Sequence, residues 1–197
     1  MNTQQQQKDA TTLVEESWAA AAGVDGVVDT FYRRLFEIRP DFKTTLFGRT
    51  NMKAQSKMLA SAIDTAVKHL RQPDVLGPVL ADLGVRHCRY GVRPEDYGPV
   101  ADALLWTLQH YLGDKFTPQT KEAWVGVLTA IAAGMSAPCE TPEGKRLLAE
   151  YEAKYPVPKR SGSGSCCGCR CSTTAACAVG GVALAVAAAL LYFRRRK

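Results

Sequence analysis

Cysteine is scarce in the body of this 197-residue chain: of its seven cysteines, Cys88 and Cys139 are the two that precede Cys166. Two cysteines make no disulfide framework of the kind that supports small secreted domains, and the pattern is typical of a reducing compartment. The first ten residues are polar and rich in glutamine, without the apolar core that a secretory signal requires. We therefore expect residues 1–10 to be a short disordered lead.

Acidic residues are absent from residue 159 onward, where seven Lys and Arg residues lie. Subtracting these seven from the 25 basic residues of the whole chain leaves 18 basic against 19 acidic residues in residues 1–158. The formal net charge of +6 therefore belongs to the C-terminal segment. Because the body lacks the basic surplus of a nucleic-acid-binding domain, we expect no nucleic-acid partner.

Strand signals are also missing, since no segment alternates strictly between apolar and polar residues and no Asn-Gly type hairpin turn separates two such runs. Helical periodicity is present instead, and Thr12, Asn51 and Thr117 stand where helix N-caps are expected. The sequence predicts an all-α domain over residues 11–155, with a break near Gly77 left open. The expected helices are 12–22, 24–38, 51–70, 73–88, 95–112, 118–136 and 140–155, with a short turn at 41–47.

The C-terminal segment changes character. Residues 156–172 are rich in Pro, Gly, Ser and Cys and predict a flexible linker. Residues 173–193 then carry no charge, and about 21 such residues are close to the roughly 20 that span a bilayer, although their alanine content makes insertion marginal. Residues 194–197 form a basic tip. We therefore expect a C-terminal transmembrane helix that anchors the protein by its tail, with the body facing the cytosol and the organelle left open.

A cluster of cysteines lies just before the predicted span, at Cys166, Cys167, Cys169 and Cys171. Cysteines beside a membrane segment are candidates for palmitoylation. The alternative is a metal site with four thiolate ligands, but these cysteines are packed too tightly for the paired C-x-x-C loops of an ordinary zinc site. We favour lipidation.

Four stretches of the body resemble the globin family, in its neuroglobin-like and flavohaemoglobin-like branches. Residues 80–97, which contain His87, are similar to the proximal region of globins. Residues 29–40 resemble the second globin helix, residues 46–48 the corner with the haem-packing phenylalanine, and residues 52–67 the distal helix. The resemblance covers residues 10–137. It implies a globin fold of six to seven helices around haem b, which is iron protoporphyrin IX.

The resemblance assigns roles on the proximal side of this haem. It implies that His87 is the ligand of the haem iron, which a neutral imidazole suits. Tyr97 lies ten residues further on, where flavohaemoglobins carry a proximal tyrosine, and Glu140 is a second candidate partner for His87. Cys88 is expected to be a packed small hydrophobe, with a redox thiol as the alternative.

On the distal side, Gln55 falls where globins carry the ligand-binding residue, Leu59 is one turn further on the same face, and Tyr32 and Phe47 complete the pocket. A hydroxyl and an amide donor suit bound dioxygen, which carries partial negative charge. Because Gln55 replaces the histidine of neuroglobins, a permanent second histidine ligand is not expected. His69 lies too far along its helix to substitute, and His110 is expected at the surface.

The implied function is reversible binding of dioxygen for storage, transport or sensing at a membrane surface. The alternative is an enzyme, a nitric oxide dioxygenase or nitrite reductase in which Tyr32 and Gln55 hold the substrates. Only about 60 residues follow the matched region, without a Gly-rich dinucleotide-binding fingerprint, so such an enzyme needs an external reductase. A third possibility is a structural globin without haem.

Overall fold

The computed structural model describes residues 9–156, and all regular structure in this part is helical. The seven α-helices are α1 (Ala10–Ala22), α2 (Val27–Ile38), α3 (Met52–Lys68), α4 (Pro73–Arg89), α5 (Tyr97–Leu112), α6 (Pro118–Ser136) and α7 (Pro142–Lys154). Short 3-10 turns η1 (Pro40–Lys43), η2 (Pro94–Asp96), η3 (Gly113–Lys115) and η4 (Ala137–Glu140) connect them. The all-α prediction is confirmed. The predicted membrane span at 173–193, the basic tip and the four linker cysteines lie outside the described residues.

Two of the three predicted side-chain caps occur in the structure. The side chains of Asn51 and Thr117 accept hydrogen bonds from backbone N–H groups three residues on, which confirms both predicted caps. The predicted cap at Thr12 is wrong, because α1 begins at Ala10 and the Asp9 carboxylate accepts from the N–H of Thr12. The break near Gly77 does not occur, and α4 continues through the exposed Pro78.

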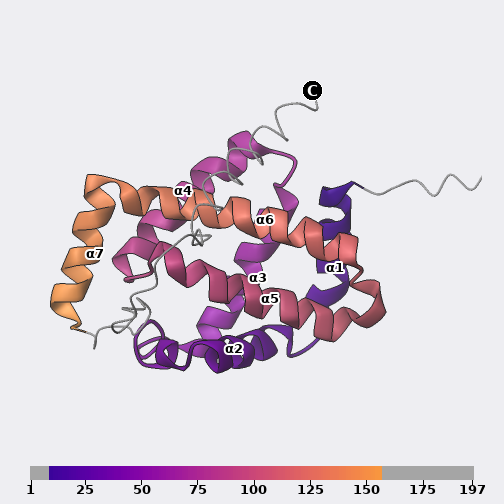
Figure 1. Cartoon of the computed structure of the whole chain (residues 1–197), viewed down its shortest axis with the longest axis horizontal. Coiled ribbons are helices and arrows are strands. Elements are labelled where there is room, and N and C mark those ends of the chain that lie inside the picture. Colours follow the sequence, from indigo (N-terminus) through magenta and orange to yellow (C-terminus); the bar gives the residue numbers. More distant parts are fainter. Residues whose placement is uncertain (1–8, 157–197) are drawn as a thin grey trace, which may run out of the picture.

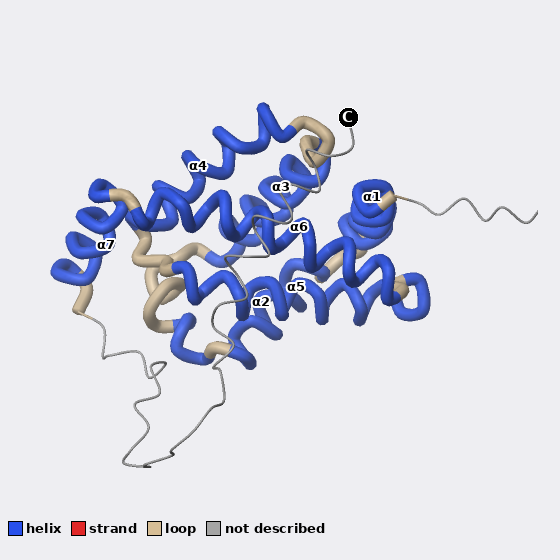
Figure 2. The backbone as a smooth tube through the Cα atoms, turned by 45° about the horizontal axis from the view of Figure 1, so that its top comes forward, coloured by secondary structure: helices blue, strands red, loops and turns tan. Residues whose placement is uncertain are grey.

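The main core lies between α1, α2, α5 and α6. Figure 1 and Figure 2 show α5 and α6 crossing the middle of the molecule, with α1 near one end. At its centre, the indole Nε1 of Trp124 donates to the Ser17 hydroxyl at 2.8 Å, so a buried donor has its partner. α4 packs against α6 through glycine, because a Cβ on Gly84 would overlap the backbone carbonyl of Met135. This close approach fixes the helix that carries His87.

The last described helix, α7, lies across one end of the molecule, shown in orange in Figure 1. It packs on α4 and η4, where Cys88, Cys139 and Leu147 form an apolar cluster separate from the main core. Cys88 and Cys139 are joined by a disulfide across 51 positions of sequence. Cys88 is fully buried, as expected of a packed residue. The expectation that the two body cysteines form no disulfide is wrong, because the tight contact between α4 and α6 brings η4 to the end of α4.

One described segment, Pro118–Glu140, is apolar and long enough to cross a bilayer by length and composition alone. This segment is α6 with η4, and Thr120, Ala123, Trp124 and Met135 of α6 are buried in the folded domain. It is therefore a core helix of the domain and differs from the predicted span at 173–193.

Candidate functional site

His87 lies in the last turn of α4 with its imidazole half-buried. Its Nδ1 lies 2.8 Å from the backbone carbonyl oxygen of Leu83, one turn earlier. Burial lowers the pKa of His87, and this hydrogen bond opposes the shift. The neutral ring then donates from Nδ1 to Leu83 and keeps the lone pair of Nε2 for a metal ion. The backbone of α4 thus orients the imidazole, and its role as an iron ligand stays a prediction.

Tyr97, the first residue of α5, lies beside this imidazole, with the ring centroids 6.2 Å apart and the planes inclined by 32°. Burial raises the pKa of Tyr97, and the neighbouring Asp96 carboxylate raises it further. Its buried hydroxyl has no hydrogen-bond partner among the residues that the structure describes. A buried hydroxyl without a partner costs about 1–3 kcal/mol, which makes it a candidate contact for a bound group.

The predicted distal residues also meet. Tyr32 of α2 is buried and forms a side-chain hydrogen bond with Gln55 of α3; burial raises the pKa of Tyr32 to about 12, and this bond opposes the shift. The Phe47 ring packs edge-on against Tyr32, with centroids 5.6 Å apart. Leu59 packs against the same core one turn beyond Gln55. Elements far apart in sequence therefore join an apolar wall to two polar donors.

Other candidates lie away from this cluster. The Glu140 side chain is 70% exposed and pairs with Lys145 at 3.7 Å, so its assignment as a partner of His87 is wrong. His69 ends α3 with its Nδ1 2.8 Å from the Thr65 carbonyl oxygen. His110 is exposed and stacks on Trp106, as expected for a surface histidine.

The sequence reasoning missed Phe36, which packs against both Phe47 and Tyr32, with centroids at 5.5 and 6.0 Å. Its signal was available, because Phe36 follows Tyr32 by four residues and so lies on the same helix face. The aromatic cluster of Tyr32, Phe36 and Phe47 holds the corner at residues 46–48 against α2.

Two recesses on the described surface lie elsewhere. One, of about 460 Å³, is lined by Trp18, Val28 and Asp64 among others, between α1, α2 and α3. The other, of about 320 Å³, lies between η2 and α7. Neither is lined by His87 or Gln55. We define the site by its side chains, because their hydrogen bonds and burial carry the chemistry.

Comparison with known proteins identifies the family of this fold. The family model described as Globin matches residues 29–135. A neuroglobin from Chaenocephalus aceratus is 32% identical over 139 residues, which cover 63% of this chain and 86% of the relative. The chain belongs to the globin family.

Other relatives extend this picture. A flavohemoprotein from Rhizobium meliloti is 33% identical over 116 residues, which span 56% of this chain and 28% of the relative. A Pseudomonas aeruginosa protein described as structurally highly homologous to human haemoglobin superposes with a TM-score of 0.59 and 28% identity, over 66% of this chain and 98% of that one. The flavohaemoglobin of Malassezia yamatoensis, solved with FAD and haem, shares the fold at a TM-score of 0.55 and 22% identity, over 73% of this chain and 37% of that one.

The residues present fit a haem group. His87 offers a free Nε2, and Tyr97 offers a buried hydroxyl with no partner among the described residues. Val79, Leu83 and His87 recur at four-residue intervals and so share one face of α4. Val79 is nevertheless 44% exposed and Leu83 half-buried. Val79 and Leu83 thus form an apolar stripe that the protein covers incompletely, next to His87, the proposed ligand. Such a stripe suits haem, which is a flat apolar ring with a central iron.

Proposed function

We propose that this chain binds haem b through Nε2 of His87 and reversibly binds dioxygen. The observation that carries the proposal is the orientation of a half-buried neutral imidazole by Leu83, in a fold that also joins Tyr32 to Gln55. Ferrous haem supplies the coordination of a diatomic gas. Storage, transport and sensing all need this binding step.

The residues of the chain have separate tasks in this proposal. The Tyr32 phenol stays protonated at neutral pH, because burial raises its pKa to about 12, and so it remains a donor. The Gln55 amide is the second donor. Phe47 and Leu59 form the apolar wall that keeps water from the gas. Tyr97 supports the proximal side through its contact with His87.

The test is the absorption spectrum of the purified ferrous protein with and without carbon monoxide. The wild-type chain should show a Soret band, and His87→Ala should lose it or lose its histidine-ligated form. His69→Ala and His110→Ala are matched controls, because each removes a histidine that lies elsewhere in the fold. A wild-type chain without a Soret band, or an unchanged spectrum in His87→Ala, contradicts the proposal.

The second candidate is nitric oxide dioxygenation, which the Tyr32–Gln55 hydrogen bond and the flavohemoprotein relatives favour. In this reaction one nitric oxide and one dioxygen combine with one electron to give nitrate. Nitrite reduction uses one electron and two protons to give nitric oxide and water. Either needs a one-electron donor. Nitric oxide consumption over many turnovers with a one-electron donor supports the enzyme, and a single stoichiometric turnover supports the carrier.

We further propose that residues 173–193 anchor the globin domain to a membrane, with the domain facing the cytosol and Cys166, Cys167, Cys169 and Cys171 as lipidation sites. Support comes from the sequence: this stretch is uncharged, and basic residues follow it. A chain that ends at Pro158 should move to the soluble fraction. If that chain still sediments with membranes, the anchor lies elsewhere.

A further inference from the structure

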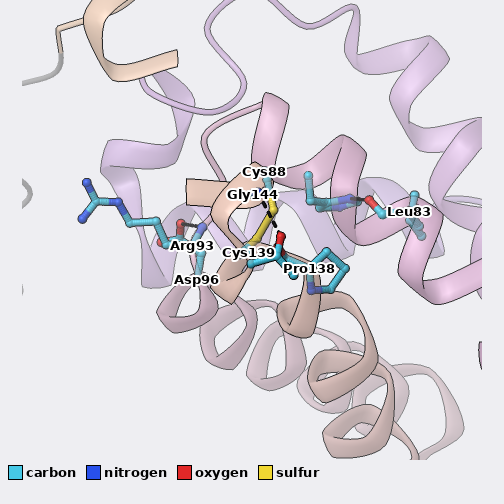
Figure 3. The surroundings of a disulfide bond; sticks show 9 residues. Leu83, Cys88, Arg93, Asp96, Pro138, Cys139 and Gly144 are labelled. Atoms are coloured by element: carbon cyan, nitrogen blue, oxygen red, sulfur yellow. Dashed lines mark hydrogen bonds between the residues drawn. A yellow bond between two sulfur atoms is a disulfide. The ribbon is translucent and has the colours of Figure 1, made fainter. Parts of the chain in front are cut away.

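The disulfide between Cys88 and Cys139 joins the helix of the proposed haem ligand to the turn before α7, as Figure 3 shows. Cys88 directly follows His87 and is fully buried. The backbone closes tightly here: the N–H of Val92 donates to the His87 carbonyl at 3.0 Å, and the N–H of Gly91 donates to the Cys88 carbonyl at 3.1 Å. A movement of Cys88 therefore acts on the turn of α4 that holds the imidazole.

The cluster around the disulfide is separate from the main core. Leu147 and Leu148 of α7 and Val85 of α4 pack around the two sulfurs. Gly144, in the first turns of α7, lies so close to Pro138 and Cys139 that a Cβ there would overlap their backbone. α7 therefore packs directly on the disulfide, and the two form one local unit.

The other half of α7 contacts the distal side of the domain. The Tyr151 ring covers Gly91, where a Cβ would overlap it, and the Tyr151 hydroxyl donates to the Thr45 carbonyl at 3.2 Å. The Arg49 guanidinium lies 3.8 Å from the centroid of the Tyr155 ring. Thr45 and Arg49 flank Phe47 of the predicted distal pocket. α7 thus connects the end of the His87 helix to the corner that carries Phe47.

We propose that Cys88 and Cys139 form a thiol–disulfide switch that is reduced by a dithiol. The switch controls how firmly α7 holds the end of the His87 helix and the corner that carries Phe47. One reductant thiolate attacks a sulfur of the pair, which breaks the disulfide and forms a mixed disulfide with the reductant. The second thiol of the reductant then attacks the reductant sulfur of the mixed disulfide and releases the cysteine of the chain as a thiol. Two electrons and two protons pass to the chain, so that Cys88 and Cys139 become thiols and the reductant becomes a disulfide.

The reductant reaches the pair by local opening of α7. Two residues of α7 are buried, Gly144 and Leu147, so this helix belongs to the less stable part of the fold. The recess of about 320 Å³ that is lined by Arg93, Lys145 and Leu148 lies beside the cluster. The matched family region ends at residue 135, so Cys139 and α7 lie outside it.

The experiment uses the full chain, with and without dithiothreitol as the dithiol. Differential alkylation and mass spectrometry report the state of Cys88 and Cys139 in the folded protein. Trypsin cleavage after Arg146 reports the release of α7, and rebinding of carbon monoxide to the ferrous protein reports the effect on the site. Cys139→Ala removes the disulfide, whereas Cys177→Ala removes one cysteine and leaves the pair intact.

We expect dithiothreitol to expose both thiols without global unfolding and to raise cleavage after Arg146 on the order of tenfold, because an opened helix is cleaved through its open population. With or without dithiol, Cys139→Ala should be cleaved as fast as the wild-type protein whose disulfide has been reduced. Cys177→Ala should behave as wild type. The switch is refuted if the pair resists the dithiol in the folded protein, if cleavage and rebinding are equal in both states, or if Cys139→Ala still responds.

The effect on ligand rebinding rests on the proposed haem function, but the alkylation and cleavage measurements do not. A missing Soret band with an intact cleavage response therefore contradicts haem binding and leaves the switch standing. A Soret band with no cleavage response supports haem binding and contradicts the switch. If Cys139→Ala does not fold, the comparison of oxidised and reduced wild-type protein still decides between the outcomes.

Discussion

Replacing Tyr32 by phenylalanine should speed the release of dioxygen from the distal pocket about tenfold. The phenol is a donor at neutral pH, because burial raises its pKa to about 12 and leaves only ~1 in 10⁵ molecules deprotonated at pH 7. A hydrogen bond of this kind contributes about 1–1.5 kcal/mol. Each 1.4 kcal/mol corresponds to about tenfold in a dissociation constant, and this loss should fall on the release rate.

Gln55→Leu should have a similar effect, and the double variant should approach but not reach a hundredfold. Tyr32 and Gln55 are hydrogen-bonded to each other, so removing one also changes the geometry of the other. Substitutions in contact commonly deviate from additivity by about 0.5–1 kcal/mol or more. A double-mutant cycle on the release rates measures this deviation.

Stopped-flow displacement of dioxygen by carbon monoxide is the assay. Tyr111→Phe is the matched control, because the Tyr111 hydroxyl bonds Thr30 of the same helix α2 at 2.9 Å, outside the distal cluster. The prediction is refuted if release from Tyr32→Phe stays within about twofold of wild type, or if Tyr111→Phe accelerates release equally.

The pKa of Tyr32 is raised on folding, so its donor is fully present below about pH 10 and is lost as the pH rises toward 12. Release should therefore be independent of pH between about 6 and 10.

Four further substitutions test the packing and the buried polar groups, each by urea unfolding. Gly84→Ala should lower the free energy of unfolding by about 1–3 kcal/mol, because its Cβ would overlap the Met135 carbonyl, whereas Gly77→Ala, in open space on the same helix, should raise it slightly. Ser17→Ala should cost about 1–3 kcal/mol by leaving the Trp124 indole N–H unpaired, and equal stability would contradict this bond. Tyr97→Phe should raise the stability of the haem-free protein by about 1 kcal/mol, since it removes a buried hydroxyl with no described partner, and a loss of stability would reveal a missed partner.

Much of the helical pattern was predictable because capping signals are local, whereas the candidate site residues came from the resemblance to globins. The caps at Asn51 and Thr117 require side chains three residues from the N–H groups that they accept. The error at Thr12 is also local: the Asp9 carboxylate accepts from the Thr12 N–H, which a capping box would have given to the Glu15 side chain, and Glu15 pairs with Arg71 instead. Gly77 and Pro78 did not break α4. Pro78 has no N–H to donate to the carbonyl one turn earlier, but this side of the helix is exposed, so water can bond that carbonyl.

The disulfide was not predictable from its own residues. Cys88 and Cys139 are 51 positions apart and lie in no spaced motif. Their meeting depends on the contact of Gly84 with Met135 and of Gly134 with Leu80, which brings the end of α6 over the end of α4. Such a contact is set by the packing of whole helices, and no pattern of cysteine spacing reports it. Phe36 differs, because its spacing of four residues from Tyr32 places it on the same helix face and makes its contact with Phe47 predictable.

The two tyrosines of the site act on opposite sides in a way that bears on function. The hydrogen bond from Gln55 opposes the rise in the pKa of Tyr32, so the amide donates to the phenol oxygen. The Tyr32 O–H can therefore donate to a bound gas without giving up that bond, since a phenol both donates and accepts. The buried hydroxyl of Tyr97 has no described partner, and its ring lies against the imidazole of His87. Because Tyr97 lies beside the proposed iron ligand, the proximal residues should contribute to holding the haem, and the distal pair should mainly set how long a gas stays bound.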